Sequence, residues 1–169
     1  MTDWMLTEFD AEMAAARRVL ERVPLEDPKW KPHPTSMEIG YLAFLVASMP
    51  GWATGALTRT ELDIKPPPGK TWGDDAPATR EGLLELFDRE SAQARMALSE
   101  ATEESLLVPW TLKMGDQPLM TQPRWMVYRR SAMNHLVHHR AQLGVYLRLL
   151  GVPVPSVYGP SADERSFGG

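Results

Sequence analysis

The sequence contains no cysteine among its 169 residues. The chain therefore cannot form a disulfide, an iron–sulfur cluster or a cysteine-ligated zinc site, and it has no thiol nucleophile of its own. This fits a reducing compartment, so we expect a cytoplasmic protein. The N-terminus also lacks the basic segment and apolar run of a secretory signal peptide.

A strong charge of either sign is missing as well. The formal net charge is -4, and acidic and basic residues alternate along the chain without forming blocks. No basic stripe is available for phosphate backbones or anionic lipid, which argues against nucleic acid as a partner. The sequence also has no dinucleotide-binding glycine motif, no Walker loop, no nucleophile elbow and no internal repeat.

Long uncharged stretches are limited to residues 39–57, which approach the length of a membrane span. This segment contains Pro50 and several glycines and has no basic flank. The other apolar segments of the chain are amphipathic. We therefore predict the central, most buried helix of a bundle and no membrane association.

Proline is abundant, and its positions divide the chain. All but one of the 15 prolines lie between or at the edges of segments with a helical apolar pattern. The pattern predicts a single all-α domain over residues 1–169, a four-helix bundle with long crossover links. The predicted helices are 3–23, 36–57, 79–100 and 123–150, followed by an extended tail over 152–169.

Local signals refine these boundaries. Residues Thr35 to Glu38 have the form of a capping box, and Pro123 occupies a favoured first helical position. Residues 111–120 predict a short hairpin with Gly115 and Asp116 at its turn. In the tail, Val154 and Tyr158 are expected to pack on the bundle before the chain frays at 166–169.

The fourth predicted helix carries three of the four histidines, His135, His138 and His139. Residues four apart lie one turn above each other, so His135 and His139 share a face. That face lies beside the predicted apolar stripe, which comprises Trp125, Ala132, Leu136, Leu143, Leu147 and Leu150. Two interpretations stay open. Either the pair ligates a metal such as zinc or nickel, or the two imidazoles hydrogen-bond to buried partners such as Tyr41 or Gln142. We expect His138 to point elsewhere, at the surface or a subunit contact.

Two stretches carry a resemblance to a known family. Residues 133–164, MNHLVHHRAQLGVYLRLLGVPVPSVYGPSADE, resemble the C-terminal signature of the DinB family, and residues 30–52, WKPHPTSMEIGYLAFLVASMPGW, resemble its second-helix signature. The resemblance implies an up-down-down-up bundle, usually a homodimer, often with three histidines from two helices on a divalent metal. Some relatives are metal-dependent thiol transferases.

Carried over by position, His135 and His139 match the histidine pair of the fourth helix. The third family histidine falls at Leu45, which has no lone pair to offer. A zinc or nickel ion is therefore expected to bind weakly or not at all. A carboxylate such as Asp10 or Glu12 is the remaining source of a third ligand, since His33 lies well before the second helix.

The resemblance therefore leaves the activity undetermined. We expect a bundle with a degenerate divalent-metal site. The alternative is a metal-dependent thiol S-transferase-like enzyme. A DNA-binding role lacks the basic surface it needs.

Arg140 is expected to pair with a carboxylate of the first or third helix, and otherwise to contact an anion or substrate. A homodimer is also expected, because Val127, Val145 and Leu149 lie off the apolar stripe. Trp52, Trp110, Trp125 and Tyr128 predict core and dimer packing, or else a pocket for a small-molecule ligand.

Overall fold

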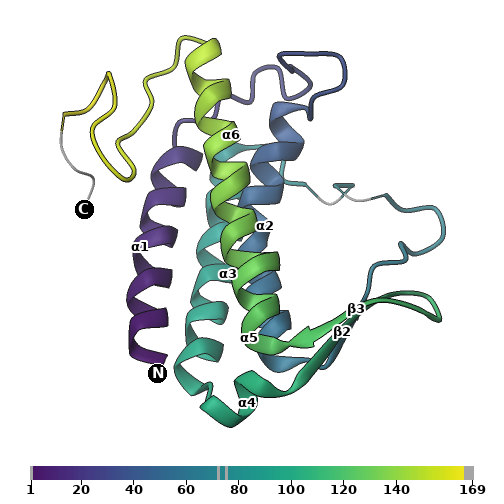
Figure 1. Cartoon of the computed structure of the whole chain (residues 1–169). Helices are drawn as coiled ribbons and strands as arrows, with labels where there is room; N and C mark the ends of the chain where they lie inside the picture. The colour runs from purple at the N-terminus through teal and green to yellow at the C-terminus, as the bar shows by residue number, and fades with distance from the viewer. Residues whose placement is uncertain (1, 72, 75, 166–169) are drawn as a thin grey trace.

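The computed structural model describes residues 2–71, 73, 74 and 76–165. Long helices pack side by side, and a small sheet lies at one end of them (Figure 1). The helices are α1 (Thr2–Leu20), α2 (Ile39–Thr58), α3 (Arg80–Glu100), the short α4 (Glu103–Leu107), and a final run made of α5 (Arg124–Val127), the π-helix η1 (Tyr128–Asn134) and α6 (His135–Leu149). Each predicted helix is present, with ends displaced by at most three residues.

Helix α2 forms the centre of the molecule. It packs against α1, α3, α5, η1 and α6, and its buried side chains run from Ile39 to Leu57. In the part of the chain that the structure describes, α2 is the one helix long and apolar enough to cross a membrane by length and composition. Its burial confirms the prediction that residues 39–57 supply the central core helix.

The start of α2 differs from the prediction. The helix begins at Ile39, three residues late, and Glu38 at its N-cap makes no side-chain capping bond. Loop carbonyls satisfy the first amides instead, since the N–H groups of Ile39 and Gly40 donate to Trp30 and Pro28 (both 2.9 Å). The predicted capping box at Thr35 to Glu38 is therefore wrong. A true capping box occurs at the start of α4, between Thr102 and Ser105.

The π-helix η1 changes which residues of the final helix face the core. A π-helix pairs residues five apart, so each residue advances the helix by a smaller angle than in an α-helix. The predicted stripe assumed one constant angle. It is correct at Ala132, Leu136, Leu143 and Leu147, which are buried, but Trp125 is 40% exposed. Val127 and Tyr128 take the core positions in its place.

The sheet corrects the expectation of a purely helical fold. The predicted hairpin is present as β2 (Pro109–Met114) and β3 (Gln117–Pro123), and Gly115 at its turn has a φ of 59°. A third strand, β1 (Glu61–Asp63), pairs in parallel with β2, giving the order β1-β2-β3. The fold is therefore mostly helical with a small three-stranded sheet. Trp110 anchors the sheet on α2, because it is buried and its indole N–H donates to the carbonyl of Gly55 (3.2 Å).

The tail packs on the bundle, as predicted. Val154 is half-buried, and the hydroxyl of Tyr158 lies within hydrogen-bond distance of Glu12 on α1 (2.8 Å) and Arg140 on α6 (2.6 Å). Glu164 accepts a hydrogen bond from the backbone N–H of Ser156 (2.8 Å) and pairs with Arg22. The predicted fraying at 166–169 falls outside the described residues.

Candidate functional site: a histidine pair on α6

The paired histidines lie in the first two turns of α6, directly after η1. Their Nε2 atoms are 2.9 Å apart, a hydrogen-bond distance. One Nε2 must carry the proton and the other must accept it, so the two atoms share one proton. His139 is buried and His135 is half-buried. The structure therefore brings together the two histidines that the spacing selected, and each is a partner of the other.

Both imidazoles favour the neutral form. Burial lowers the pKa of His135, and the neighbouring His139 lowers it further. Burial also lowers the pKa of His139, although its hydrogen bond with the Oε1 of Gln142 (2.7 Å) acts in the opposite direction. Gln142 is one of the two partners that the sequence suggested. Neutral imidazole is the form that binds metal ions, so protonation does not exclude ligation here.

Trp52 of α2 forms one wall beside the pair. Its ring and that of His135 meet edge to face, with centroids 5.4 Å apart. His138 is exposed, as predicted, but it does not point fully away, because its ring lies 5.0 Å from that of His139. The helical-wheel angle used in the prediction ignored how far an imidazole can swing around its own helix.

Helix spacing assigns Leu45 to the face of α2 that carries Trp52. Trp52 contacts His135, while Tyr146 donates a hydrogen bond to the carbonyl of Met37 (3.1 Å), so α2 and α6 run in opposite directions. Residues seven apart share a helix face, which aligns Leu45 with Trp52. Seven residues back from Trp52 in α2 correspond to seven residues on from His135 in the antiparallel α6, so this spacing puts Leu45 at the level of Gln142. Its side chain is buried at 9% exposure.

The carboxylates considered as a replacement ligand are occupied elsewhere. Asp10 pairs with Arg95 of α3 (2.9 Å), and Glu12 pairs with Arg140 of α6 (2.6 Å). His33 is exposed and hydrogen-bonds to Thr35 in the loop before α2. The pair between Arg140 and Glu12 confirms the predicted ion pair of Arg140 with the first helix.

The residues present do not fit a three-ligand metal centre. Within the described ranges, no group of three or more His, Cys, Asp or Glu side chains is arranged to hold a metal ion. The two Nε2 atoms stand 2.9 Å apart, close to the separation of two nitrogens at neighbouring positions of an octahedral ion, so the pair offers two of the three ligands that such a centre needs.

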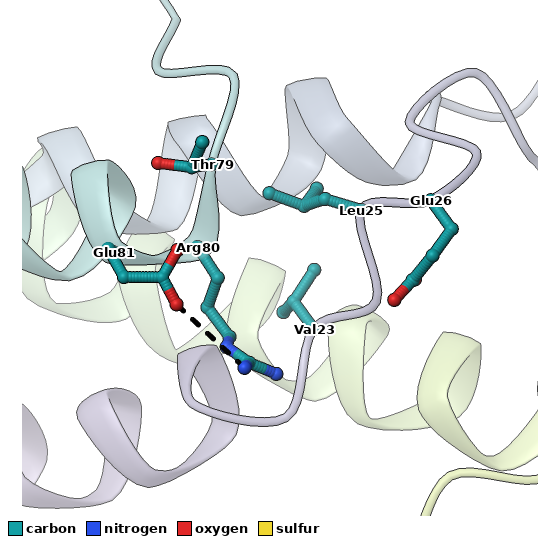
Figure 2. A pocket seen from close by; sticks show the side chains of 6 residues that line it. All are labelled: Val23, Leu25, Glu26, Thr79, Arg80 and Glu81. Atoms are coloured by element: carbon teal, nitrogen blue, oxygen red, sulfur yellow. Dashed lines mark ion pairs between the residues drawn. The ribbon is translucent and has the colours of Figure 1, made fainter.

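Clefts also open on the surface of the described part of the chain, and two of them are considered in turn. Figure 2 shows the smaller, about 290 Å³, where Thr79, Arg80 and Glu81 at the start of α3 face the loop residues Val23, Leu25 and Glu26. Arg80 and Glu81 form an ion pair there, at 3.9 Å.

The larger cleft, about 550 Å³, lies between α2 and α3 and is lined in part by Trp52. Among Trp52, Trp110, Trp125 and Tyr128, only Trp52 lines this cleft. Trp110 and Tyr128 are core residues, and Trp125 is partly exposed.

Comparison with known proteins places the chain in a family. The sequence profile of the DinB family matches residues 5–166. A DinB-like protein from Bacillus cereus ATCC 10987 has a similar structure, with a TM-score of 0.68, 22% identity, and coverage of 90% of this chain and 95% of its own. A DinB-like protein from Bacillus subtilis is similar too, with a TM-score of 0.67, 17% identity, and coverage of 97% and 100%. A comparison with curated protein sequences finds no match. The two structural likenesses speak for the fold alone, whereas the profile covers nearly the whole chain, and the protein therefore belongs to the DinB family.

Proposed function

We propose that this chain is a DinB-family bundle in which the His135 and His139 pair is a degenerate divalent-metal site of weak affinity. One observation carries the proposal: the two nitrogens that a metal would need are hydrogen-bonded to each other at 2.9 Å. A zinc or nickel ion has to displace the proton of that bond before it gains two ligands. Two ligands hold such an ion much less firmly than the three protein ligands of a usual catalytic zinc site.

Leu45 supports the same proposal from the facing helix. Its aliphatic side chain is buried and supplies no electron pair, and helix spacing puts it on the same face of α2 as Trp52. A hydrogen-bonded pair of neutral histidines is a stable occupant of such a buried site, because burying a charge there is costly. The pair then acts as a packing element between α2 and α6 that keeps part of a metal site.

Metal content tests the proposal. Tag-free protein is dialysed against zinc, nickel and manganese in turn and examined by elemental analysis, with His135→Ala and Leu45→His as comparators. We expect far less than one ion per chain in the natural protein and close to one in Leu45→His. Leu45→Gln controls for polarity at the same position, since an amide is a poor zinc ligand. A stoichiometric ion in the natural protein that is lost in His135→Ala would overturn the proposal.

The alternative is a metal-dependent thiol S-transferase-like enzyme. Its support is that both imidazoles are neutral by environment and present their Nε2 atoms on one side, next to Trp52. It requires a third ligand besides these two. If the natural protein holds a stoichiometric ion, assays of transfer of a low-molecular-weight thiol to an electrophile decide whether this alternative replaces the first.

We also propose the up-down-down-up order of the long helices. Three sets of contacts support it. Arg17 pairs with Asp88 and Arg95 with Asp10, so α1 and α3 are antiparallel. Arg129 pairs with Glu8 and Arg140 with Glu12, so the final helix runs parallel to α1. The third set comprises the contacts of α2 with α6 given above, which make those two helices antiparallel.

A cytoplasmic homodimer completes the proposal. Val145 and Leu149 on α6 are 58% and 59% exposed, as expected for a face that meets a second copy. Val127, the third residue considered for that face, is buried within its own chain and does not belong to it. The absence of cysteine supports a reducing compartment. Fractionation of cells that produce the protein tests the location.

A further inference from the structure

The larger cleft has a size and lining suited to a small molecule. Its volume, about 550 Å³, lies within the range of ligand sites in proteins. Phe44 and Trp52 of α2 face Leu86 of α3 across it, and these three side chains are partly exposed. Together they offer an apolar surface on which an aromatic or aliphatic group can lie.

A carboxylate is built into the wall of this cleft. The side chain of Glu90 is 21% exposed, and its Oε1 accepts a hydrogen bond from Arg89 (3.0 Å). Its Oε2 lies directly against Gly51 of α2, because a Cβ placed on that glycine would be only 2.5 Å away. A larger residue at position 51 would displace the carboxylate. Glycine here lets the Glu90 carboxylate of α3 lie against the backbone of α2, in a wall that Trp52 also lines.

The charges that line the cleft sum to a single negative charge. Glu85 and Glu90 contribute two negative charges and Arg89 one positive charge, and no further Lys or Arg is among the described residues that line it. Arg89 is paired with Glu90, so this pair is close to neutral and the net negative charge of the described lining comes from Glu85. The lining therefore favours a ligand with one positive charge. The indole face of Trp52 adds to this preference, since aromatic rings attract cations.

We propose that this cleft binds a small organic monocation with an apolar, preferably aromatic, body. The ammonium group lies between Glu85 and Glu90, and the body packs against Trp52 and Leu86. This goes beyond the proposed function, because it requires no metal at the histidine pair. Trp52 touches both places, with His135 on one side and the cleft on the other, so a bound ligand changes the surroundings of its indole.

Three probes of similar size and different charge test the proposal on the natural protein. Phenethylamine is cationic, phenylpropionate anionic and phenylethanol neutral at pH near 7. Each is titrated into protein carrying isotope-labelled tryptophan, and the indole N–H resonance of Trp52, assigned with Trp52→Phe, is followed by NMR. We expect phenethylamine to shift this resonance in a saturable way at millimolar concentration, and phenylpropionate to leave it unchanged.

Two charge-removing variants refine the test. Glu90→Gln keeps the shape of the side chain and should weaken phenethylamine binding by roughly fivefold, the scale expected of one partly exposed charge pair. Glu81→Gln removes an exposed carboxylate from the same helix outside this cleft and should leave binding unchanged. Equal shifts with all three probes, no saturable shift with phenethylamine, or undiminished binding in Glu90→Gln would each overturn the proposal. His135→Ala, which disables the metal site, should still bind phenethylamine.

Discussion

Arg140 of α6 and Glu12 of α1 form a buried ion pair, with 2.6 Å between Nη1 and Oε2 and side chains only 3% and 13% exposed. The same guanidinium donates to the backbone carbonyl of Glu12 (3.2 Å) and to the hydroxyl of Tyr158 (2.6 Å), whose ring lies beneath it. One cation thus joins the first helix, the last helix and the tail. A charge so far from water depends on these partners for its stability.

Replacing Arg140 should therefore destabilise the fold strongly. We expect Arg140→Met to lower the free energy of unfolding by about 3 kcal/mol, because it leaves the Glu12 carboxylate buried without its cation. Chemical denaturation followed by circular dichroism measures the change. The double variant Glu12→Leu with Arg140→Met should recover part of the loss, since no unpaired charge is left. A single variant as stable as the natural protein would contradict the account.

In contrast to Arg140, removing the buried hydroxyl of Tyr128 should not lower the free energy of unfolding. Its ring is 1% exposed, and the hydroxyl has no hydrogen-bond partner among the protein atoms described. Burial raises the pKa of this hydroxyl, in keeping with a site that disfavours charge. Tyr128→Phe should therefore leave stability unchanged or raise it by up to about 1 kcal/mol. Tyr146→Phe is the matched control. It removes a hydrogen bond to Met37 (3.1 Å) and should cost about 1 kcal/mol.

Much of the helical layout could be predicted from the sequence, because its signals are local. Apolar spacing fixes which side of α1 and α3 faces the core, and prolines mark where the helices end. The hairpin followed from Gly115 and Asp116, since the turn needs a residue that tolerates positive φ. The start of α2 was misplaced for the reverse reason. Its first amides are satisfied by Pro28 and Trp30, and backbone carbonyls of a loop leave no trace in the side-chain sequence.

Features that depend on packing between distant segments could not be predicted. Strand β1 is three residues long and pairs with a segment some fifty residues later, so it has no local pattern. The π-helix η1 changes the helix phase at Tyr128–Asn134, and its sequence resembles an ordinary α-helix. Spacing correctly put His135 and His139 on one face. The position of the Glu90 carboxylate against Gly51 depends on how α2 and α3 approach one another.

The histidine pair should make stability depend on pH. Because the pKa values of His135 and His139 are lowered in the folded state, the unfolded chain binds protons more readily below its ordinary histidine pKa of about 6.5. The free energy of unfolding should therefore fall as the pH drops from about 7.5 to about 5.5. Carboxylates with lowered pKa values, such as Asp163 and Glu164, act at lower pH.

Denaturation curves at the two pH values measure this effect. The fall in stability should be smaller in His139→Gln, which removes one of the two buried imidazoles, than in the natural protein. His33→Gln serves as the control at an exposed histidine outside the pair. A fall of the same size in His139→Gln would show that other groups produce the pH dependence.

The exposed face of α6 gives the last prediction. Val145 and Leu149 lie four residues apart, so both project from one side of the helix, and each has more than half of its surface in contact with solvent in the single chain. If this face meets a second copy, Val145→Glu with Leu149→Glu buries charge in the contact and should convert a dimer at micromolar concentration to a monomer, as measured by sedimentation. Leu119→Glu, at a 47% exposed leucine of β3, is the matched control and should leave the dimer intact.

A natural protein that sediments as a monomer would contradict the proposed dimer, whereas a dimer that survives the double change would place the contact on another face. Both circular dichroism and the denaturation midpoint should be unchanged in each variant monomer, because neither side chain belongs to the core of its own chain.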